Sequence, residues 1–317
     1  GFESIHYRNR AQLIDDSFNL ATAEFIEFDI LLGIMDYMKY EEDYIPWMAA
    51  NRAISFLNPR LTGSKVSKDY QEFLRTNIAA IFNRLGIELI PNESRLDRYA
   101  RTIAINVACR NQLPECLEKS NEELNAYLID QKRIEPEYLT TIYCNGLRIG
   151  GAFEFFSMQN RMLRSSIQSE RNNIISAMAC TQSIELLNAY LNLAIIPGIT
   201  LSFDEKSRIL TSPATHGEEW LIVMLKFAER YYMFIHQDDP NLLLNMLTVI
   251  SKSVVSVHST ELFMNLLGNL RSQNIITQEV MLSLLMNTLT FYNFYDDRMD
   301  PIYQFFEQRR LGSTTSA

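Results

Sequence analysis

Apolar residues recur at steps of three and four along most of this chain, whereas alternation with a period of two is nearly absent. One such stripe consists of Trp220, Met224, Phe227, Ala228, Tyr231 and Ile235, and the next of Leu243, Met246, Leu247, Ile250 and Val254. A stripe with a period near 3.6 residues lets a helix bury one face against its neighbours. The pattern therefore predicts an all-α fold.

Turn and capping signals divide this pattern into about sixteen helices of roughly ten to twenty residues. Asp239-Pro240 and Asp300-Pro301 each place a capping carboxylate before a first-turn proline, and Ser120 with Glu123 forms a capping-box pattern. Stops are expected at Asn58-Pro59, Gly86, Gly150-Gly151, Pro197-Gly198 and Thr211 to Gly217. Short connections favour antiparallel hairpins, and a run of such hairpins stacks into a curved α-solenoid of the HEAT or armadillo type.

No low-complexity linker divides the 317 residues. We therefore expect a single helical domain over residues 1–311, followed by a disordered tail over residues 312–317 that is rich in serine and threonine.

The chain contains four cysteines, Cys109, Cys116, Cys144 and Cys180. Seven residues along one straight helix span about 10.5 Å, which exceeds the ~7 Å that a disulfide tolerates between α-carbons. Cys109 and Cys116 can thus pair only across a bend, which Pro114 predicts, and Cys144 would then pair with Cys180. Two disulfides suit an oxidising compartment, but four buried free thiols in a cytosolic protein fit the composition equally well.

The charge of the chain argues against a nucleic acid partner, and its composition does not determine the cellular compartment. The net charge is -9, and no basic run is longer than Arg309-Arg310, so we expect no nucleic acid partner. No stretch approaches the ~18 apolar residues of a membrane span, and a signal or anchor would have to lie outside this chain. The sequon Asn92-Glu93-Ser94, in an expected loop, predicts N-glycosylation at Asn92 if the protein is secreted.

The histidines do not form a recognisable metal site. The chain has His6, His216, His236 and His258, and none has a second histidine four residues later, so the zinc-helix pattern His-Glu-x-x-His is missing. His216-Gly217-Glu218 offers the His-x-Glu of a zinc deaminase, but no Cys-x-x-Cys follows. We expect a loop histidine near a helix start.

Neighbouring acidic residues are expected to lie on solvated faces or to cap helices, because adjacent helical positions point about 100° apart. Glu41-Glu42-Asp43 is one such group. Asp15-Asp16 interrupts apolar positions, so one of the two is expected near the core in an ion pair with Arg10 or Arg52. No glycine-rich phosphate loop is present. The residues by themselves describe a noncatalytic helical module, without catalytic, cofactor-binding or metal-binding residues.

Four stretches carry a family resemblance. They are Asn9 to Ala21 (NRAQLIDDSFNLA), Tyr44-Ile45-Pro46-Trp47, Ile142-Tyr143-Cys144-Asn145-Gly146 and Ala177-Met178-Ala179-Cys180. In this order they resemble the C-terminal helical domain of the aminopeptidase N family of gluzincin zinc metallopeptidases, over about residues 9 to 230. The cysteine spacings are similar to those of the two disulfides in vertebrate-type members. Glu218 stands where an apolar residue is usual, and Phe227 replaces a second tryptophan, which is typical of a divergent member.

The resemblance implies the substrate-access, or cap, domain of an extracellular zinc aminopeptidase, a hydrolase that removes N-terminal residues from peptides. In this family the zinc ligands belong to an earlier domain, so zinc is implied for the parent protein and no cofactor for this chain. Its implied partners are the parent's catalytic domain, peptide substrates and, as in some members, a second copy. Family members are typically cell-surface ectodomains held by a membrane anchor, and secretion and glycosylation go with that location.

Two other interpretations remain at this stage. A catalytically silent paralogue could use the helical array as an ectodomain that binds a peptide or protein ligand, and the departures at Glu218 and Phe227 favour this alternative. A cytosolic helical scaffold unrelated to peptidases is the third, and four free thiols would distinguish it from the other two.

Overall fold

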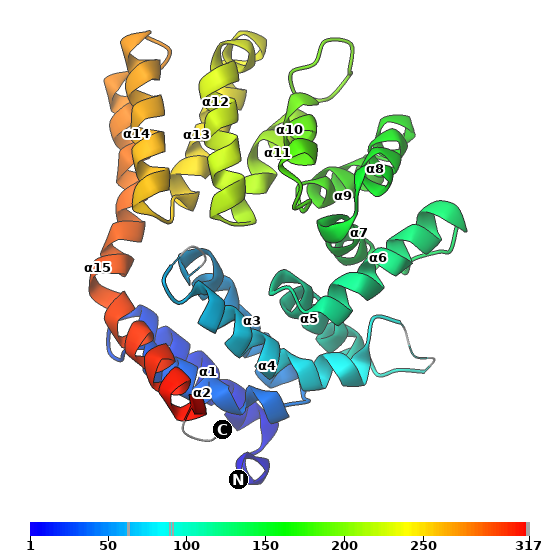
Figure 1. Cartoon of the computed structure of the whole chain (residues 1–317), viewed down its shortest axis with the longest axis vertical. Coiled ribbons are helices and arrows are strands. Elements are labelled where there is room, and N and C mark those ends of the chain that lie inside the picture. Colours follow the sequence, from blue (N-terminus) through cyan, green and yellow to red (C-terminus); the bar gives the residue numbers. More distant parts are fainter. Residues whose placement is uncertain (62–63, 89, 91, 315–317) are drawn as a thin grey trace. The chain divides into compact units, whose positions relative to one another are not determined.

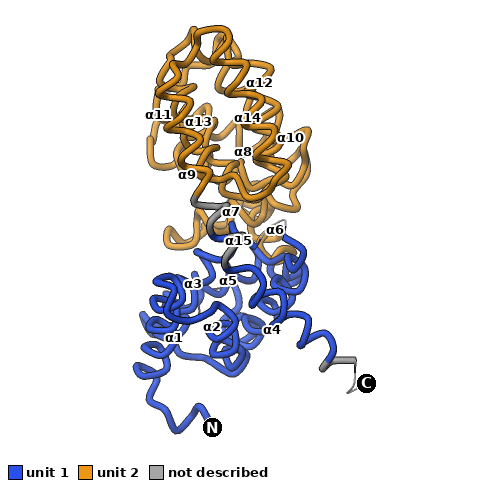
Figure 2. Tube along the Cα trace, turned by 90° about the vertical axis from the view of Figure 1, so that its left-hand side faces the viewer, with its two compact units in different colours: residues 1–116, 293–317 blue, residues 117–292 orange. Residues whose placement is uncertain are grey.

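The computed structural model describes residues 1–61, 64–88, 90 and 92–314. Within these residues the chain forms fifteen α-helices and three 3-10 helices, with no strand (Figure 1). The all-α fold class is thus confirmed, and the number of α-helices is close to the expected sixteen. The chain divides into two compact units, which are Gly1–Cys116 with Asn293–Ala317, and Leu117–Tyr292 (Figure 2).

The first unit joins the beginning and the end of the chain around one core. Its elements are η1 (Phe2–Ser4), α1 (Tyr7–Thr22), α2 (Phe28–Met35), η2 (Asp36–Tyr40), α3 (Tyr44–Leu61), α4 (Ser67–Leu85), α5 (Arg95–Arg110), the start of α6 (Pro114–Ile129) and the last part of α15 (Gln278–Thr314). Helix α1 packs on α2 and α3, and α4 packs on α5 and η2. Phe306 of α15 makes edge-to-face contacts with Tyr70 and Phe73 of α4, so the end of the sequence completes this core.

Local sequence explains where the helices of this unit begin and end. Along α3, Ala50, Ala53, Ile54 and Leu57 follow three- and four-residue steps, and all four are buried. Gly86 ends α4 with a φ of 60°, a conformation that glycine adopts without a steric penalty. The expected stop at Asn58-Pro59 is slightly early, because α3 continues to Leu61 with Pro59 inside its last turn.

The second unit is a continuous run of helices. It contains most of α6, then α7 (Leu139–Ile149), α8 (Ala152–Arg164), α9 (Gln168–Met178), α10 (Ile184–Asn192), α11 (Phe203–Thr211), η3 (Ser212–Thr215), α12 (Glu218–Asp238), α13 (Pro240–Ser253), α14 (Val257–Ser272) and the first part of α15. Helices that follow one another in the sequence pack side by side, as α8 with α9 and α12 with α13 do (Figure 1). Such hairpins are the elements of an α-solenoid, and their stacking into one curved array stays a prediction.

The strongest sequence patterns of the second unit correspond to its core. Met224, Phe227, Ala228 and Ile235 are buried along α12, as the stripe predicts. Helix α13 begins at Pro240, where the Asp239 carboxylate accepts a hydrogen bond from the backbone N–H of Asn241 at 2.8 Å. Both predictions rest on local sequence, and both are confirmed.

Two predicted helix starts are wrong. Ser120 is not an N-cap but a fully buried residue inside α6, which begins six residues earlier at Pro114, since proline is well suited to the first turn. Pro301 lies inside α15. Met299, Ile302 and Phe306 are buried on either side of it, so packing of one continuous face outweighs the ~3 kcal/mol that an internal proline costs.

The predicted tail over residues 312–317 extends beyond the described part of the chain. Helix α15 is described to Thr314, and residues 315–317 lie outside the described residues. Among the helices of the described residues, none combines the length and the apolar character that crossing a membrane requires.

Candidate functional site

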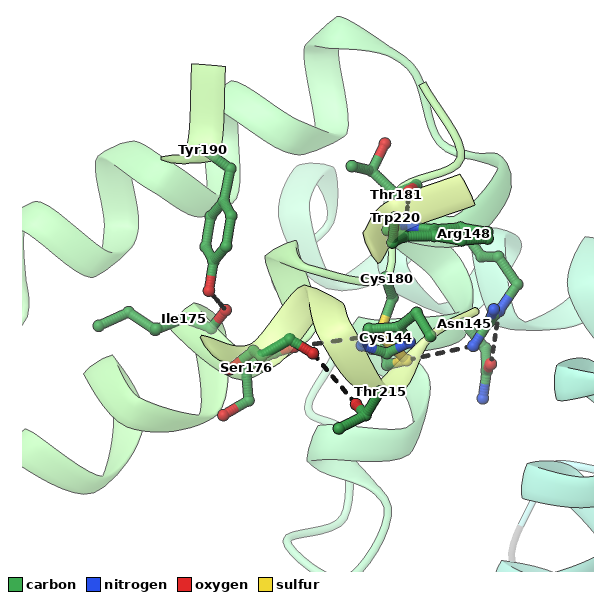
Figure 3. The surroundings of a disulfide bond; sticks show 12 residues. Cys144, Asn145, Arg148, Ile175, Ser176, Cys180, Thr181, Tyr190, Thr215 and Trp220 are labelled. Atoms are coloured by element: carbon green, nitrogen blue, oxygen red, sulfur yellow. Dashed lines mark hydrogen bonds between the residues drawn. A yellow bond between two sulfur atoms is a disulfide. The ribbon is translucent and has the colours of Figure 1, made fainter. Parts of the chain in front are cut away.

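Within the second unit, a disulfide joins Cys144 in α7 to Cys180 in the turn after α9 (Figure 3). The sulfur atoms are 2.05 Å apart and the α-carbons 5.3 Å apart, which lies within the range of disulfide geometry. In the first unit, Cys109 and Cys116 have α-carbons 5.2 Å apart across the bend between α5 and α6. The structure thus brings both expected pairs to bonding distance and leaves no cysteine free.

Each sulfur of the Cys144–Cys180 bond has a nitrogen-bearing side chain beside it. Arg148, one turn after Cys144 and buried, donates from Nη2 to Cys144 Sγ at 3.6 Å and from Nε to the Oδ1 atom of Asn145 at 3.3 Å (Figure 3). On the other side, His216 Nε2 lies 3.8 Å from Cys180 Sγ. A buried guanidinium and an imidazole therefore flank one covalent bond.

Hydrogen bonds connect the turn that carries Cys180 to later helices. The indole Nε1 of Trp220, in the first turn of α12, donates to the carbonyl oxygen of Thr181 at 2.9 Å (Figure 3). The Tyr190 hydroxyl of α10 donates to the carbonyl oxygen of Ile175 in α9 at 2.9 Å. Burial raises the pKa of Tyr190, so this hydroxyl remains a neutral donor over the physiological pH range. The turn after α9 is thus bonded to α12, and α9 itself is bonded to α10.

Gly146 allows α7 to approach α6 closely. A Cβ at this position would lie 2.7 Å from Leu124 Cβ and 2.8 Å from the carbonyl oxygen of Ser120. The carbonyl oxygen of Gly146 accepts a hydrogen bond from Asn121 Nδ2 at 2.9 Å. A residue larger than glycine would have to separate the two helices.

Another group of polar side chains surrounds Glu205, which caps α11 and whose side chain is 3% exposed. Desolvation acts to raise the pKa of this carboxyl, but hydrogen bonds from Arg171, the Ser202 N–H and Gln168 oppose it and lower the pKa to about 2. Glu205 is therefore ionised throughout the physiological range.

The first unit contains a buried ion pair between Arg10 and Glu41. Glu41 accepts hydrogen bonds from Arg10 Nε at 2.7 Å, from Arg10 Nη2 at 2.9 Å and from the Tyr37 hydroxyl at 3.1 Å. Its backbone carbonyl accepts from Trp47 Nε1 at 2.9 Å, and Arg10 also contacts the Asp43 carboxylate at 2.8 Å. The pair connects α1 to the start of α3.

This pair corrects two sequence-based interpretations. Glu41 is 1% exposed, so it is an exception to the expectation that most neighbouring acidic residues lie on solvated faces or cap helices, because a buried guanidinium requires a carboxylate beside it. Asp15 is half-exposed and pairs with Arg52 at 2.8 Å, one of its two predicted partners, while Asp16 is exposed. Neither aspartate lies in the core. The 31 positions between Arg10 and Glu41 leave no local signal in the sequence that could have revealed their contact.

The four stretches that carry the family resemblance all contribute to these junctions. Arg10 and Trp47 belong to the Glu41 cluster, Gly146 to the close approach of α7 and α6, and Cys144 and Cys180 to the disulfide. The chemistry of these groups is that of structural hydrogen bonding, ion pairing and covalent cross-linking.

The part of the chain that the structure describes offers no set of ligands for a zinc ion. Among the described residues, no three His, Cys, Asp or Glu side chains gather in a way that could hold a metal. His216 lies beside the disulfide, and Glu218 accepts a hydrogen bond from the Ser256 hydroxyl, which caps α14. His216-Gly217-Glu218 is therefore used in packing.

Asn92, the predicted glycosylation position, is exposed and has a left-handed φ of 62°. Ser94, the third residue of the sequon, caps α5 by accepting a hydrogen bond from the Asp97 N–H at 3.1 Å. The asparagine side chain is thus accessible, and its modification stays a prediction.

The described residues thus form an all-α fold with two disulfides. The family model of the ERAP1-like C-terminal domain matches residues 2–307, and this chain belongs to that family. The match spans residues of both compact units, and a single helical domain over residues 1–311 stays a prediction.

Curated relatives are aminopeptidases, in agreement with the resemblance seen in the sequence. The chain is 30% identical over 226 residues to aminopeptidase N of Plutella xylostella, covering 71% of this chain and 24% of that protein. It is 32% identical over 215 residues to aminopeptidase N of Bos taurus, covering 65% and 22%. It is 26% identical over 195 residues to the membrane alanyl aminopeptidase of Heliothis virescens, covering 62% and 19%. The chain thus spans about a quarter or less of each of these relatives, and they support a C-terminal domain of a peptidase.

Proposed function

We propose that this chain is the noncatalytic substrate-access domain of an extracellular zinc aminopeptidase that removes N-terminal residues from peptides. The observation that carries the proposal is the family match over residues 2–307, together with relatives named aminopeptidase N. In this proposal the zinc site belongs to the parent's catalytic domain. That domain is the main partner of this chain, and the helices limit which peptides reach it.

Structural chemistry supports the noncatalytic part of the proposal. Within the four family stretches, Arg10 is engaged in an ion pair, Gly146 in a close helix contact, and Cys144 and Cys180 in a disulfide, all of which are structural roles. Two disulfides also favour an oxidising compartment, which agrees with a cell-surface or secreted parent protein.

Peptidase assays on the parent and on this chain alone test the proposal. We expect the parent to release the N-terminal residue from an aminoacyl p-nitroanilide and from peptides, to lose this activity with a chelator and to recover it with Zn²⁺. The isolated chain should have no activity under any of these conditions. Chelator-sensitive activity of the isolated chain would refute the noncatalytic assignment.

The access role makes a separate prediction about substrate length. The intact parent should discriminate among peptides of two to about twelve residues that share one N-terminal residue. A parent truncated before this domain, once shown to be folded by its circular dichroism, should cleave the long and short peptides with more similar kcat/KM values. An unchanged length dependence would contradict the access role.

Glycosylation at Asn92 belongs to the same proposal, because only a secreted parent would carry it. Asn92→Gln should remove a mass shift that an endoglycosidase also removes, since this chain has no other Asn-x-Ser/Thr sequon. Ser94→Thr is the matched control, because threonine preserves both the sequon and a capping hydroxyl. A mass that is the same in the wild type and in Asn92→Gln would contradict the prediction.

A catalytically silent, ligand-binding ectodomain remains the second candidate function. The observations that favour it are the family departures Glu218 and Phe227. Both are accommodated by packing, since Glu218 accepts from Ser256 and the buried Phe227 ring lies 4.8 Å from the Tyr231 ring. A properly folded parent without peptidase activity that still binds a peptide or protein would favour this candidate over the first.

A further inference from the structure

The two disulfides differ in solvent access. Cys109 and Cys116 are both fully buried, at 0% exposure. In the other bond Cys180 is 1% exposed, but Cys144 is partly exposed on α7. Of the two bonds, only Cys144–Cys180 therefore contains a cysteine that is partly exposed to solvent.

The two disulfides also differ in their polar neighbours. Cys116 Sγ lies 3.4 Å from the carbonyl oxygen of Ile105, which would repel a thiolate. Arg148 donates to Cys144 Sγ at 3.6 Å, and His216 Nε2 lies 3.8 Å from Cys180 Sγ, closer than the Ser176 carbonyl oxygen at 4.0 Å. Cationic or hydrogen-bond-donating groups beside a thiolate stabilise it and make the thiol a better leaving group.

We propose that Cys144–Cys180 is a redox-responsive disulfide that a dithiol reductant opens in the folded protein, whereas Cys109–Cys116 is a permanent structural bond. This inference is independent of the proposed peptidase function, because it concerns only groups within this chain.

The exchange proceeds in two balanced steps. A thiolate of the dithiol attacks the accessible Cys144 Sγ, the Cys144–Cys180 bond breaks, and the Cys180 thiolate leaves beside His216 Nε2. The second thiolate of the reductant then attacks the reductant sulfur that is bonded to Cys144 in the mixed disulfide. This step closes the cyclic disulfide of the reductant and releases the Cys144 thiolate beside Arg148. The protein disulfide gains two electrons and two protons in total, and the dithiol is oxidised to its cyclic disulfide.

Opening this bond would affect a junction of helices. Cys180 is followed by Thr181, whose carbonyl oxygen holds the Trp220 indole at the start of α12. Reduction removes the covalent link between this turn and α7, so the turn and the first turn of α12 would open more often. The redox state of the bond would thereby control local order in the second unit.

Differential alkylation of the folded chain tests the proposal. The protein is incubated with dithiothreitol without denaturant, alkylated at intervals, and digested so that mass spectrometry quantifies each cysteine. We expect Cys144 and Cys180 to become alkylated at least about tenfold faster than Cys109 and Cys116. This follows because thiol–disulfide exchange is faster at an accessible sulfur and at a bond whose leaving thiolate is stabilised by neighbouring groups. Equal rates, or faster reduction of Cys109–Cys116, would overturn the proposal.

Two variants test the assigned roles. His216→Leu and Arg148→Gln should each slow reduction of Cys144–Cys180 several-fold, whereas His236→Leu, near the end of α12 and outside this cluster, should not. Near-UV circular dichroism verifies that each variant is folded, and the comparison of the two bonds in the wild type remains decisive if Arg148→Gln does not fold. An unchanged rate in a folded His216→Leu variant would refute the leaving-group role.

Hydrogen exchange of residues 179–183 and 212–220 should increase on reduction, and no increase would refute control of local order.

Discussion

Substitution of Gly146 by alanine tests the packing of α7 on α6 most directly. The new Cβ would lie 2.7 Å from Leu124 Cβ, 2.8 Å from the Ser120 carbonyl oxygen and 2.9 Å from Leu124 Cδ2. Two of these three atoms are a Cβ and a backbone oxygen, which no rotamer change can move away. The helices must therefore separate, or α7 must shift, to accept one methyl group.

The expected magnitude is a balance of two opposing terms. Alanine inside a helix is favoured over glycine by about 0.5–1 kcal/mol, whereas overpacking a tight contact costs about 1–3 kcal/mol. With three contacts below 3 Å, the cost lies at the upper end of that range. We expect Gly146→Ala to lower the free energy of unfolding by about 2 kcal/mol.

Gly268→Ala is the matched control, because it places the same substitution inside α14 with no atom within 4 Å of the new Cβ. It should raise the free energy of unfolding by about 0.5–1 kcal/mol. Urea titration followed by the tryptophan fluorescence of Trp47 and Trp220 should show a midpoint about 0.7 M lower for Gly146→Ala, for a slope near 3 kcal/mol/M. A Gly146→Ala variant as stable as Gly268→Ala would refute the close approach of the two helices.

Three further predictions follow from buried polar groups and the covalent link. Glu41→Ala leaves a buried guanidinium without its carboxylate and should lower the free energy of unfolding by about 3–5 kcal/mol. Asp15→Ala breaks an exposed pair and should lower it by less than about 1 kcal/mol. Similar unfolding midpoints for the two variants would contradict this difference. Because the folded-state pKa of Glu205 is lowered to about 2, its contribution is present above pH ~4.5 and is lost as pH falls toward 2. Glu205→Gln should flatten the acid side of the pH–stability curve, and a curve with unchanged slope would contradict the assignment. Replacing Cys144 and Cys180 together by alanine should lower the free energy of unfolding by about 4 kcal/mol in the chain-entropy model, as measured by urea titration, and a loss below 1 kcal/mol would show that the bond constrains the unfolded chain little.

The helix boundaries show which local signals are sufficient. Asp239-Pro240 predicts the start of α13 because the capping carboxylate and the N–H that it satisfies are two residues apart. Gly86 ends α4 because its conformation depends on that residue alone. Ser120 with Glu123 matches the same kind of local pattern, but α6 continues through both residues, since burial of one helix face over a longer segment stabilises more than a cap does.

In the candidate site, too, some features follow from local sequence and others appear only in the folded protein. The cysteine spacings and the bend at Pro114 restrict the disulfide pairing, and the four family stretches indicate the family that the chain belongs to. The partners of Arg10 and Trp47, which belong to two of those stretches, were beyond sequence reasoning. His216 was expected as an ordinary loop histidine, and its place beside Cys180, 36 positions earlier in the chain, appears only in the folded protein.

By itself, the sequence determined the helical class of this protein, several helix boundaries and the family, because periodicity, caps and turns act over a few residues. Only the tertiary structure decided that Glu41 is buried with Arg10, that α15 continues through Pro301, and that α7 approaches α6 at Gly146. These outcomes depend on which surfaces meet in the fold. The physical reason is that burial and pairing are set by contacts between residues far apart in the chain, and such contacts can outweigh the local preference of either partner.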